Sequence, residues 1–333
     1  LPGESKASFY AGVRDIIRQN IDGLHMFPAM LLDGSEMGTR ASRERFGIKG
    51  EWRRIDGCAG RYGPVRAVEY EEIITSTSAM SREDHIEVRL FHFLQALFLD
   101  TKLYKDVEVL LGERTLFDLI SDVITRQTEA APAFRALLED FMRRSREELS
   151  SGRPDEFTDE DVERSLATRV KLNPLFIAKL LHDPGVRHAF HQYLARIISS
   201  YGAAEAVEIA AVLGFIESSV YPFDGSANID VSMPFDAVAF ARRSSLQKVR
   251  AKDFLTSEPK SFRYHKPFTY HEFIEKMDPA LPLSAKVYEV VLHHTHEKLR
   301  YTLIRRLQGE TDPAQARAGG EKREIRLEGG WLY

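Results

Sequence analysis

From Ser81 to about Val220 the sequence is a succession of helical patterns divided by short polar breaks, and this succession limits the fold most strongly. Ser81 followed by Asp84 resembles a capping box, and an apolar stripe repeats behind it at helical spacing. The stripe comprises Ile86, Leu90, Phe93, Leu94, Leu97 and Phe98. No repeat of fixed period is present, so a solenoid is not predicted. We expect a mainly helical region over residues 81–333.

The first fifty residues have the pattern of alternating helix and strand. After a Pro-Gly turn, Ser5 can cap a helix whose apolar positions over residues 9–17 recur at helical spacing. Residues 24–32 then form a nearly continuous apolar run, which is typical of a parallel strand covered on both faces. Because no strand precedes the first turn, we expect the chain to begin within a domain.

Residues 51–80 predict a small β-rich extension. Two extended segments, Trp52–Ile55 and Val65–Ile74, flank a glycine-rich loop at Gly57–Pro64. Further along, Phe235–Ala241 is a candidate strand in a region of mixed pattern, and Ala285–Leu307 predicts a last helix. The whole chain is therefore expected to be α/β, with its helices concentrated after residue 80.

Composition and charge exclude several classes of partner. The chain has 333 residues, 43% of them hydrophobic, and a net charge of -4 from 46 basic and 50 acidic side chains. Such a balance provides no field that would attract nucleic acid or anionic lipid. No apolar run reaches the roughly 20 residues of a membrane span, and the N-terminus lacks the pattern of a signal peptide. We expect a cytoplasmic protein with no nucleic-acid or membrane partner.

Candidate metal ligands are sparse. The single cysteine, Cys58, rules out an internal disulfide and a metal site built only from cysteines of one chain. Two histidine groups, His293–His296 and His188 with His191, have no evident acid or cysteine to complete a ligand set, so no metal site is predicted. His85 and His92, seven residues apart beside the apolar stripe, are interpreted as packing or hydrogen-bonded residues. No nucleophile elbow, phosphate-binding loop or dinucleotide fingerprint is present.

The N-terminal run resembles a known family. The turn Leu1-Pro2-Gly3-Glu4-Ser5, the helix after it, and the run from His25 to Met37 follow one another as in radical S-adenosylmethionine (SAM) proteins, around their fifth and sixth barrel strands. The similarity continues through Arg45-Phe46-Gly47, Tyr62-Gly63, Glu69–Glu72 and Met80–Asp84. These later segments resemble the large members that carry an N-terminal cobalamin-binding domain. The likeness covers about the first hundred residues.

The resemblance implies a fold and a site. Residues 1–50 would be the final βα units of an incomplete parallel barrel, 51–80 a β-rich extension, and 81–333 a mainly helical C-terminal region. Ligands of such barrels lie at the carboxyl ends of the strands. Gly3, Glu4, Phe27, Pro28 and Met30 would then form one wall of the SAM pocket. Glu4 would accept hydrogen bonds from SAM or fix the turn, and Phe27, Pro28 and Met30 would supply an apolar wall and backbone groups for the adenine ring. Without the family, the Pro-Gly-Glu run indicates only a tight turn.

The resemblance also implies what this chain lacks. Radical SAM proteins hold a [4Fe–4S] cluster on three cysteine thiolates, which a chain with one cysteine cannot supply. We expect the cluster, and any cobalamin, to be bound by an upstream part of the same polypeptide, and this fragment alone to be inactive. The parent would act on a small-molecule or biosynthetic-intermediate substrate, with methyl transfer as one option. The alternative is a non-catalytic helical interaction or regulatory protein.

Overall fold

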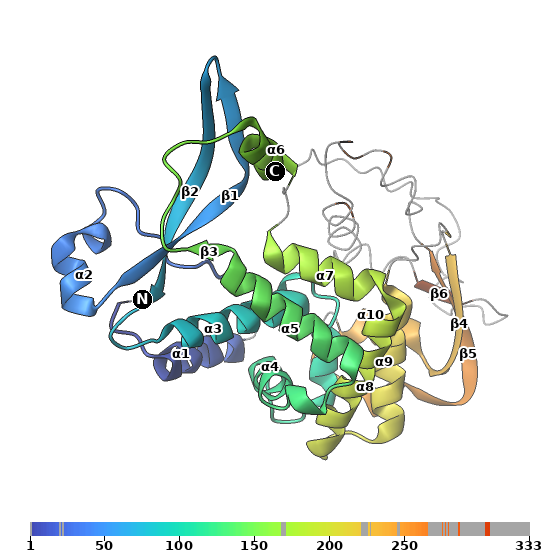
Figure 1. Cartoon of the computed structure of the whole chain (residues 1–333). Coiled ribbons are helices and arrows are strands. Elements are labelled where there is room, and N and C mark those ends of the chain that lie inside the picture. Colours follow the sequence, from blue (N-terminus) through green and yellow to red (C-terminus); the bar gives the residue numbers. More distant parts are fainter. Residues whose placement is uncertain are drawn as a thin grey trace, which may run out of the picture.

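Helix α3 (Arg82–Gln95) lies at the centre of a helical body, from which a β-hairpin projects (Figure 1). The computed structural model describes residues 2–19, 21, 23–167, 171–220, 226, 228–244, 247–265 and 304–306, with isolated positions at 275, 277, 279 and 286. Within these residues the fold is mixed α/β, with more helix than strand, and both of its sheets are antiparallel.

The elements follow in a fixed order from the N-terminal helix to the C-terminal sheet. The α-helices are α1 (Lys6–Arg18), α2 (Arg40–Phe46), α3, α4 (Leu116–Thr125), α5 (Pro132–Glu147), α6 (Asp159–Ala167), α7 (Leu172–His182), α8 (Pro184–Ser200), α9 (Ala206–Ser219) and α10 (Ala237–Ser244). The strands are β1 (Lys49–Tyr62), β2 (Val65–Ser76), β3 (Leu149–Ser150), β4 (Asn228–Phe235), β5 (Leu255–His265) and β6 (Ile304–Arg306). Short 3-10 turns cover Glu36–Gly38, Lys105–Leu110, Gln127–Glu129 and Ala251–Phe254, and a π turn covers Ala96–Asp100.

The predicted helical region is confirmed around α3. The Ser81 hydroxyl accepts a hydrogen bond from the Asp84 amide at 3.1 Å, and the Asp84 carboxylate accepts one from the Ser81 amide at 3.0 Å. These two bonds form the capping box that starts α3. All six residues of the predicted apolar stripe are buried. Phe93 stacks on Phe141 of α5, with ring centroids 4.8 Å apart, and so joins the two helices.

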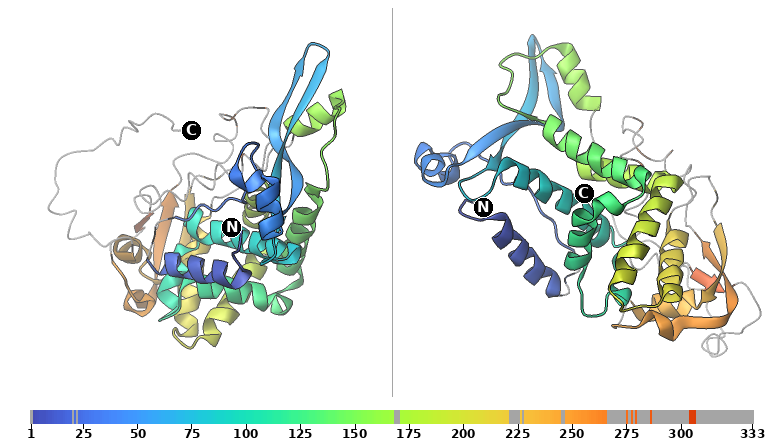
Figure 2. Two further views of the ribbon diagram at one scale, coloured as in Figure 1. Left: turned by 90° about the vertical axis from the view of Figure 1, so that its left-hand side faces the viewer. Right: turned by 60° about the horizontal axis from the view of Figure 1, so that its bottom comes forward.

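The hairpin differs from the prediction in the length of its loop. Strand β1 continues through the expected loop and pairs with β2 as far as Tyr62 and Val65. Gly57 has φ of +77°, and the pairing register shifts between Arg54 and Ala59, which marks a bulge. A glycine can take this conformation without strain, so the bulge bends the strand without ending it. The result is a long arm with α6 beside its outer part (Figure 2).

The N-terminal turn and helix are confirmed, whereas the parallel strand is not observed. Residues 23–29 take no regular structure, and Met30 forms an isolated antiparallel bridge with Ile73 of β2. The Ile74 amide donates to the Ala29 carbonyl at 2.8 Å, which continues this pairing. A parallel strand needs a parallel neighbour, and among the described residues this segment pairs only with β2, which runs in the opposite direction. A partial parallel barrel is therefore not seen among the residues that the structure describes.

The C-terminal sheet corrects two further expectations. The candidate strand Phe235–Ala241 is wrong, because β4 ends at Phe235 and α10 begins two residues later. The Asp236 carboxylate accepts a hydrogen bond from the Ala239 amide at 3.0 Å, a capping interaction that favours a helix start. The expected helix Ala285–Leu307 lies largely outside the described residues. Its described end, Ile304–Arg306, is strand β6 and pairs with β5.

A chain of charges joins the hairpin to the helical body. Arg89 of α3 is buried and forms an ion pair with Glu148, the residue between α5 and β3. Arg53 of β1 lies 3.6 Å from the same carboxylate and donates to Glu71 of β2 at 2.7 Å. Every side chain in this chain of four charges is less than a quarter exposed. The alternating charges therefore compensate one another in a region where little water is present to solvate them.

We predict that Glu148→Gln lowers the free energy of unfolding by about 3 kcal/mol, because it leaves the Arg89 guanidinium buried without a counter-charge. The neighbouring Glu147 pairs with Arg143 on the exposed face of α5 and provides a matched control. Glu147→Gln should cost less than about 0.5 kcal/mol. Urea denaturation followed by circular dichroism measures both changes, and equal losses in the two variants would contradict the assigned role of Glu148.

Candidate functional site

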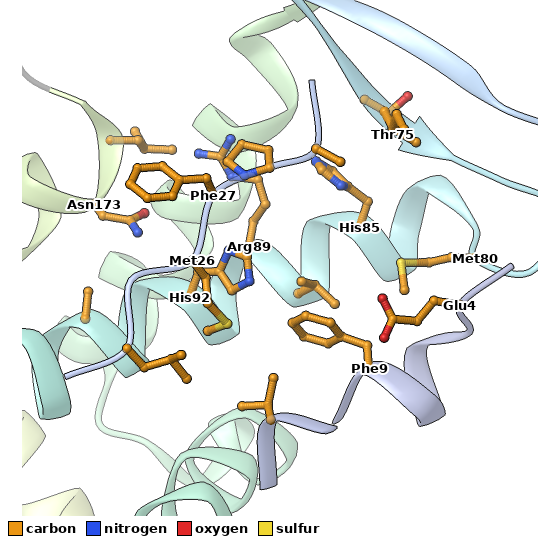
Figure 3. A pocket seen from close by; sticks show the side chains of 18 of the residues that line it. Glu4, Phe9, Met26, Phe27, Thr75, Met80, His85, Arg89, His92 and Asn173 are labelled. Atoms are coloured by element: carbon orange, nitrogen blue, oxygen red, sulfur yellow. The ribbon is translucent and has the colours of Figure 1, made fainter. Parts of the chain in front are cut away.

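A cavity of about 560 Å³ lies where five parts of the chain meet (Figure 3). Its walls come from α1, from residues 24–29, from the end of β2 with the loop after it, and from α3, and residues 171–174 at the start of α7 complete it. Most of the wall is apolar, with Phe9, Val13 and Met26 among the contributors. Its volume falls in the range of about 300–1,000 Å³ that is usual for small-molecule pockets.

Three of the five residues predicted to bind a cofactor line this cavity. Glu4 lies at the end of the cavity next to Met80. Phe27 and Pro28 belong to residues 24–29, the crossing segment, which runs across the cavity. Phe27 is 74% exposed, so most of its side chain is accessible. Gly3 and Met30 do not line the cavity. Gly3 has φ of +84° and forms the turn, and Met30 bridges to β2.

The C-terminal end of α3 holds the crossing segment in place. The Gln95 side-chain amide donates to the Leu24 carbonyl at 2.6 Å and to the Asp100 carboxylate at 3.1 Å. The Leu24 amide donates to the same carboxylate at 3.3 Å. Asp100 ends the π turn, a helix irregularity that is frequent at functional sites, and it lines the cavity. The Asp100 side chain is only 13% exposed, and this burial raises its pKa.

Sequence reasoning missed the polar residues of α3. His85, Arg89 and His92 occupy positions i, i+4 and i+7, so they share one helix face, and all three line the cavity. The Nε2 atoms of both histidines are buried and have no hydrogen-bond partner among the described residues. In the sequence, the seven-residue spacing of His85 and His92 beside the apolar stripe was the signal that could have identified them. The same spacing is equally consistent with histidines that only pack against the core.

Both histidines are neutral near pH 7. Burial, aided by the positive charge of Arg89, lowers the pKa of His85 to about 4. Burial and the same guanidinium also lower the pKa of His92 to about 4. Each ring therefore offers one N–H donor and one acceptor nitrogen rather than a charge. Such a pair can orient a ligand by hydrogen bonds.

Other histidines are accounted for elsewhere. His191 shares a hydrogen bond of 2.9 Å with the hydroxyl of the fully buried Tyr104, and His188 shares one of 2.9 Å with Gln192. His293, His294 and His296 lie outside the described residues. Among the residues that the structure does describe, no group of three histidine, cysteine, aspartate or glutamate side chains could hold a metal ion. In that same part of the chain, no helix has the length and apolarity to cross a membrane.

Two comparisons with known proteins identified no relative of this chain. No family model matches the sequence, and the search of curated proteins found no significant match. The functional interpretation therefore depends on the residues of the cavity and on the resemblance of the N-terminal run.

We predict that the protein loses stability as the pH falls from about 6.5 toward 4. The folded pKa values of His85 and His92 lie below the unfolded value of 6.5, so protonation favours the unfolded chain in this window. At pH 5 each histidine should cost about 2 kcal/mol relative to pH 7.

The double variant His85→Gln/His92→Gln should therefore lose less stability between pH 7 and pH 5 than the unaltered chain. Thermal and urea denaturation at the two pH values measure the difference. His188→Gln, at an exposed position on α8, is the control and should leave the pH dependence unchanged. If the double variant kept the full acid sensitivity, the two rings would not be the titrating groups.

Proposed function

We propose that the chain is the C-terminal portion of a radical SAM enzyme and that its cavity holds the nucleoside part of SAM. The observation that carries the proposal is that Glu4 and the Phe27-Pro28 pair line one cavity, although a helix separates them in sequence. The resemblance selects the same residues for the SAM pocket. Two of the wall residues that it implies, Gly3 and Met30, instead support the turn and the bridge to β2.

The chemistry of the cavity suits a nucleoside. Phe27 at the opening and Phe9 on α1 offer ring faces and edges against which a base can pack. Glu4 supplies carboxylate oxygens, which are acceptors for ribose hydroxyls or for an exocyclic amine. His85 and His92 also line the cavity, and their Nε2 atoms lack a hydrogen-bond partner among the described residues. An apolar wall with a few convergent polar groups is typical of cofactor pockets.

The residues do not fit a [4Fe–4S] cluster. Three thiolates are required, and Cys58 is the single cysteine of the chain. Cys58 is half-buried in β1 and does not line the cavity. We therefore propose that the cluster and any cobalamin are held by the preceding part of the polypeptide. The contribution of this chain is to bind SAM and the substrate.

Exposed apolar side chains support a contact with the rest of such an enzyme. Ile16 of α1 is 43% exposed, and Leu32, beyond the crossing segment, is 59% exposed. Phe27 and Met30 lie between them in sequence and are also exposed. Large apolar groups gathered within one segment and its neighbouring helix are a common feature of protein contacts. In the proposed enzyme the preceding part of the polypeptide would cover Ile16, Met30 and Leu32.

The same exposed residues favour the second candidate, a non-catalytic helical interaction protein. In that case the segment around Phe27 and Leu32 would contact a partner, and the cavity would have no preference for nucleosides. The two candidates therefore differ in a property that can be measured on this chain without the cluster.

We predict that the chain binds 5′-deoxyadenosine with a Kd below about 1 mM, as measured by ligand-observed NMR and calorimetry. Phe27→Ala should weaken this binding about tenfold, because stacking on an aromatic ring contributes about 1–3 kcal/mol per base. Tyr62, on the hairpin arm, is exposed to a similar degree, at 69%, and lies outside the cavity. Tyr62→Ala is therefore the matched control. Absence of nucleoside binding, or equal effects of the two variants, would favour the interaction protein.

A further inference from the structure

The crossing segment, residues 24–29, is attached to the rest of the chain in different ways at its two ends. At the C-terminal end the attachment is made by the backbone. The Ile74 amide donates to the Ala29 carbonyl at 2.8 Å, and the Leu31 amide donates to the Glu72 carbonyl at 2.8 Å. Leu31 is buried in a small apolar cluster that includes Ile74. This end is therefore fixed to β2 as a further part of its sheet.

The N-terminal end of the segment is held by side chains. The Leu24 carbonyl accepts a hydrogen bond from the Gln95 amide group, and the Leu24 amide donates one to the Asp100 carboxylate. Gln95 and Asp100 are themselves joined by a hydrogen bond of 3.1 Å. The exposed His25 lies 3.6 Å from the second carboxylate oxygen of Asp100. Among the described residues, no backbone hydrogen bond fixes this end. Release of Leu24 would therefore free it.

The middle of the segment has little to hold it. The backbone of residues 25–28 makes no hydrogen bond to any other described residue, and Pro28 has no N–H to donate. Met26 packs against the main core, whereas Phe27 is 74% exposed. Gly23, which precedes the segment, is exposed and takes no regular structure. A segment with few hydrogen bonds and a glycine at one end opens locally at low cost.

The segment covers the cavity from one side. Met26, Phe27 and Pro28 line the cavity from the segment, and Phe9 and Val88 line it from α1 and α3 (Figure 3). A ligand in the cavity would therefore lie between the segment and the two helices. Movement of the segment away from the helices would open the length of the cavity.

We propose that residues 24–29 form a strap over the cavity, which stays fixed at Ala29 and opens at Leu24. Gln95 and Asp100 form its latch, because they bind both the amide and the carbonyl of Leu24. The ligand enters while the latch is open, and a bound ligand keeps the strap closed. The inference deepens the proposed function, on which it rests for the identity of the ligand.

Hydrogen exchange of single backbone amides, followed by NMR on the 333-residue chain, tests the strap without a ligand. The Leu24 amide belongs to the latch, whereas the Leu31 and Ile74 amides belong to the fixed end. After correction for intrinsic rates, we expect the Leu24 amide to exchange at least tenfold faster than the other two. Equal protection at the two ends would overturn the inference.

The variant Gln95→Met tests the latch itself. Methionine keeps the length of the side chain but cannot donate to Leu24 or Asp100. Exchange of the Leu24 amide should become about tenfold faster, while the Leu31 and Ile74 amides keep their rates. An equal rise at all three amides would show a general loss of stability and would count against a local latch.

The variant Gly23→Ala should act in the opposite direction. The added methyl group would meet the Asp100 carboxylate at 4.0 Å, an ordinary contact. Alanine has fewer backbone conformations than glycine, so the open state gains less freedom and the Leu24 amide should exchange about threefold more slowly. Leu24 exchange that stayed the same in both variants would overturn the inference.

Thiol labelling tests whether the strap controls access to the cavity. Val88→Cys places a thiol in the cavity wall, and Cys58→Ser removes the single native thiol. Addition of Gln95→Met to this double variant should raise the rate of reaction with dithiodipyridine about tenfold. Equal rates with and without Gln95→Met would show that the cavity is reached without opening of the strap, which would overturn its role.

The nucleoside separates this inference from the proposed function. Saturation with 5′-deoxyadenosine should slow exchange of the Leu24 amide at least tenfold, because a ligand beneath the strap holds it closed. If the nucleoside bound and left this exchange unchanged, the strap would be rejected and the SAM pocket retained. If the exchange and labelling results were as expected and the nucleoside did not bind, the SAM pocket alone would be rejected.

Discussion

The ion pair between Arg89 and Glu148 is the interaction on which the rest of the structure depends. It lies where α3, the end of α5 and the hairpin meet, and Arg53 and Glu71 continue it into both strands of the arm. A buried guanidinium is costly unless a counter-charge is close. The chain therefore orients the hairpin on α3 at the place where the cavity forms. Burial lowers the pKa of His85 and of His92, and the positive charge of Arg89 adds to this effect, so one interaction influences both the fold and the site.

Local sequence signals were sufficient to predict the starts of α1 and α3. Ser81 and Asp84 predicted the start of α3, and Ser5 predicted that of α1, because caps depend on neighbours three residues away. The run 24–32 was read as a parallel strand because apolar continuity indicates burial on both faces. Strand direction is set by the neighbouring strand, and that neighbour is β2. Which strand lies beside a segment is decided by the tertiary structure, and the hydrophobic periodicity of that segment does not reveal it.

The site was partly predictable for the same reason. The resemblance selected Glu4, Phe27 and Pro28, which line the cavity, and Gly3 and Met30, which do not. His85 and His92 were interpreted as packing residues, since a histidine beside an apolar stripe is usually satisfied by the protein. Only the three-dimensional structure shows that their Nε2 atoms are buried and lack a partner among the described residues, and that both side chains line a cavity. The distinction depends on residues 24–29, which cover α3 from far away in sequence.

Two independent sets of residues thus meet at one cavity. The family resemblance identified one set without reference to α3, and the unpartnered nitrogen atoms identified the other without reference to any family. The first set comes from the turn before α1 and from residues 24–29, and the second set comes from α3. The cavity therefore brings together side chains that are far apart in the sequence.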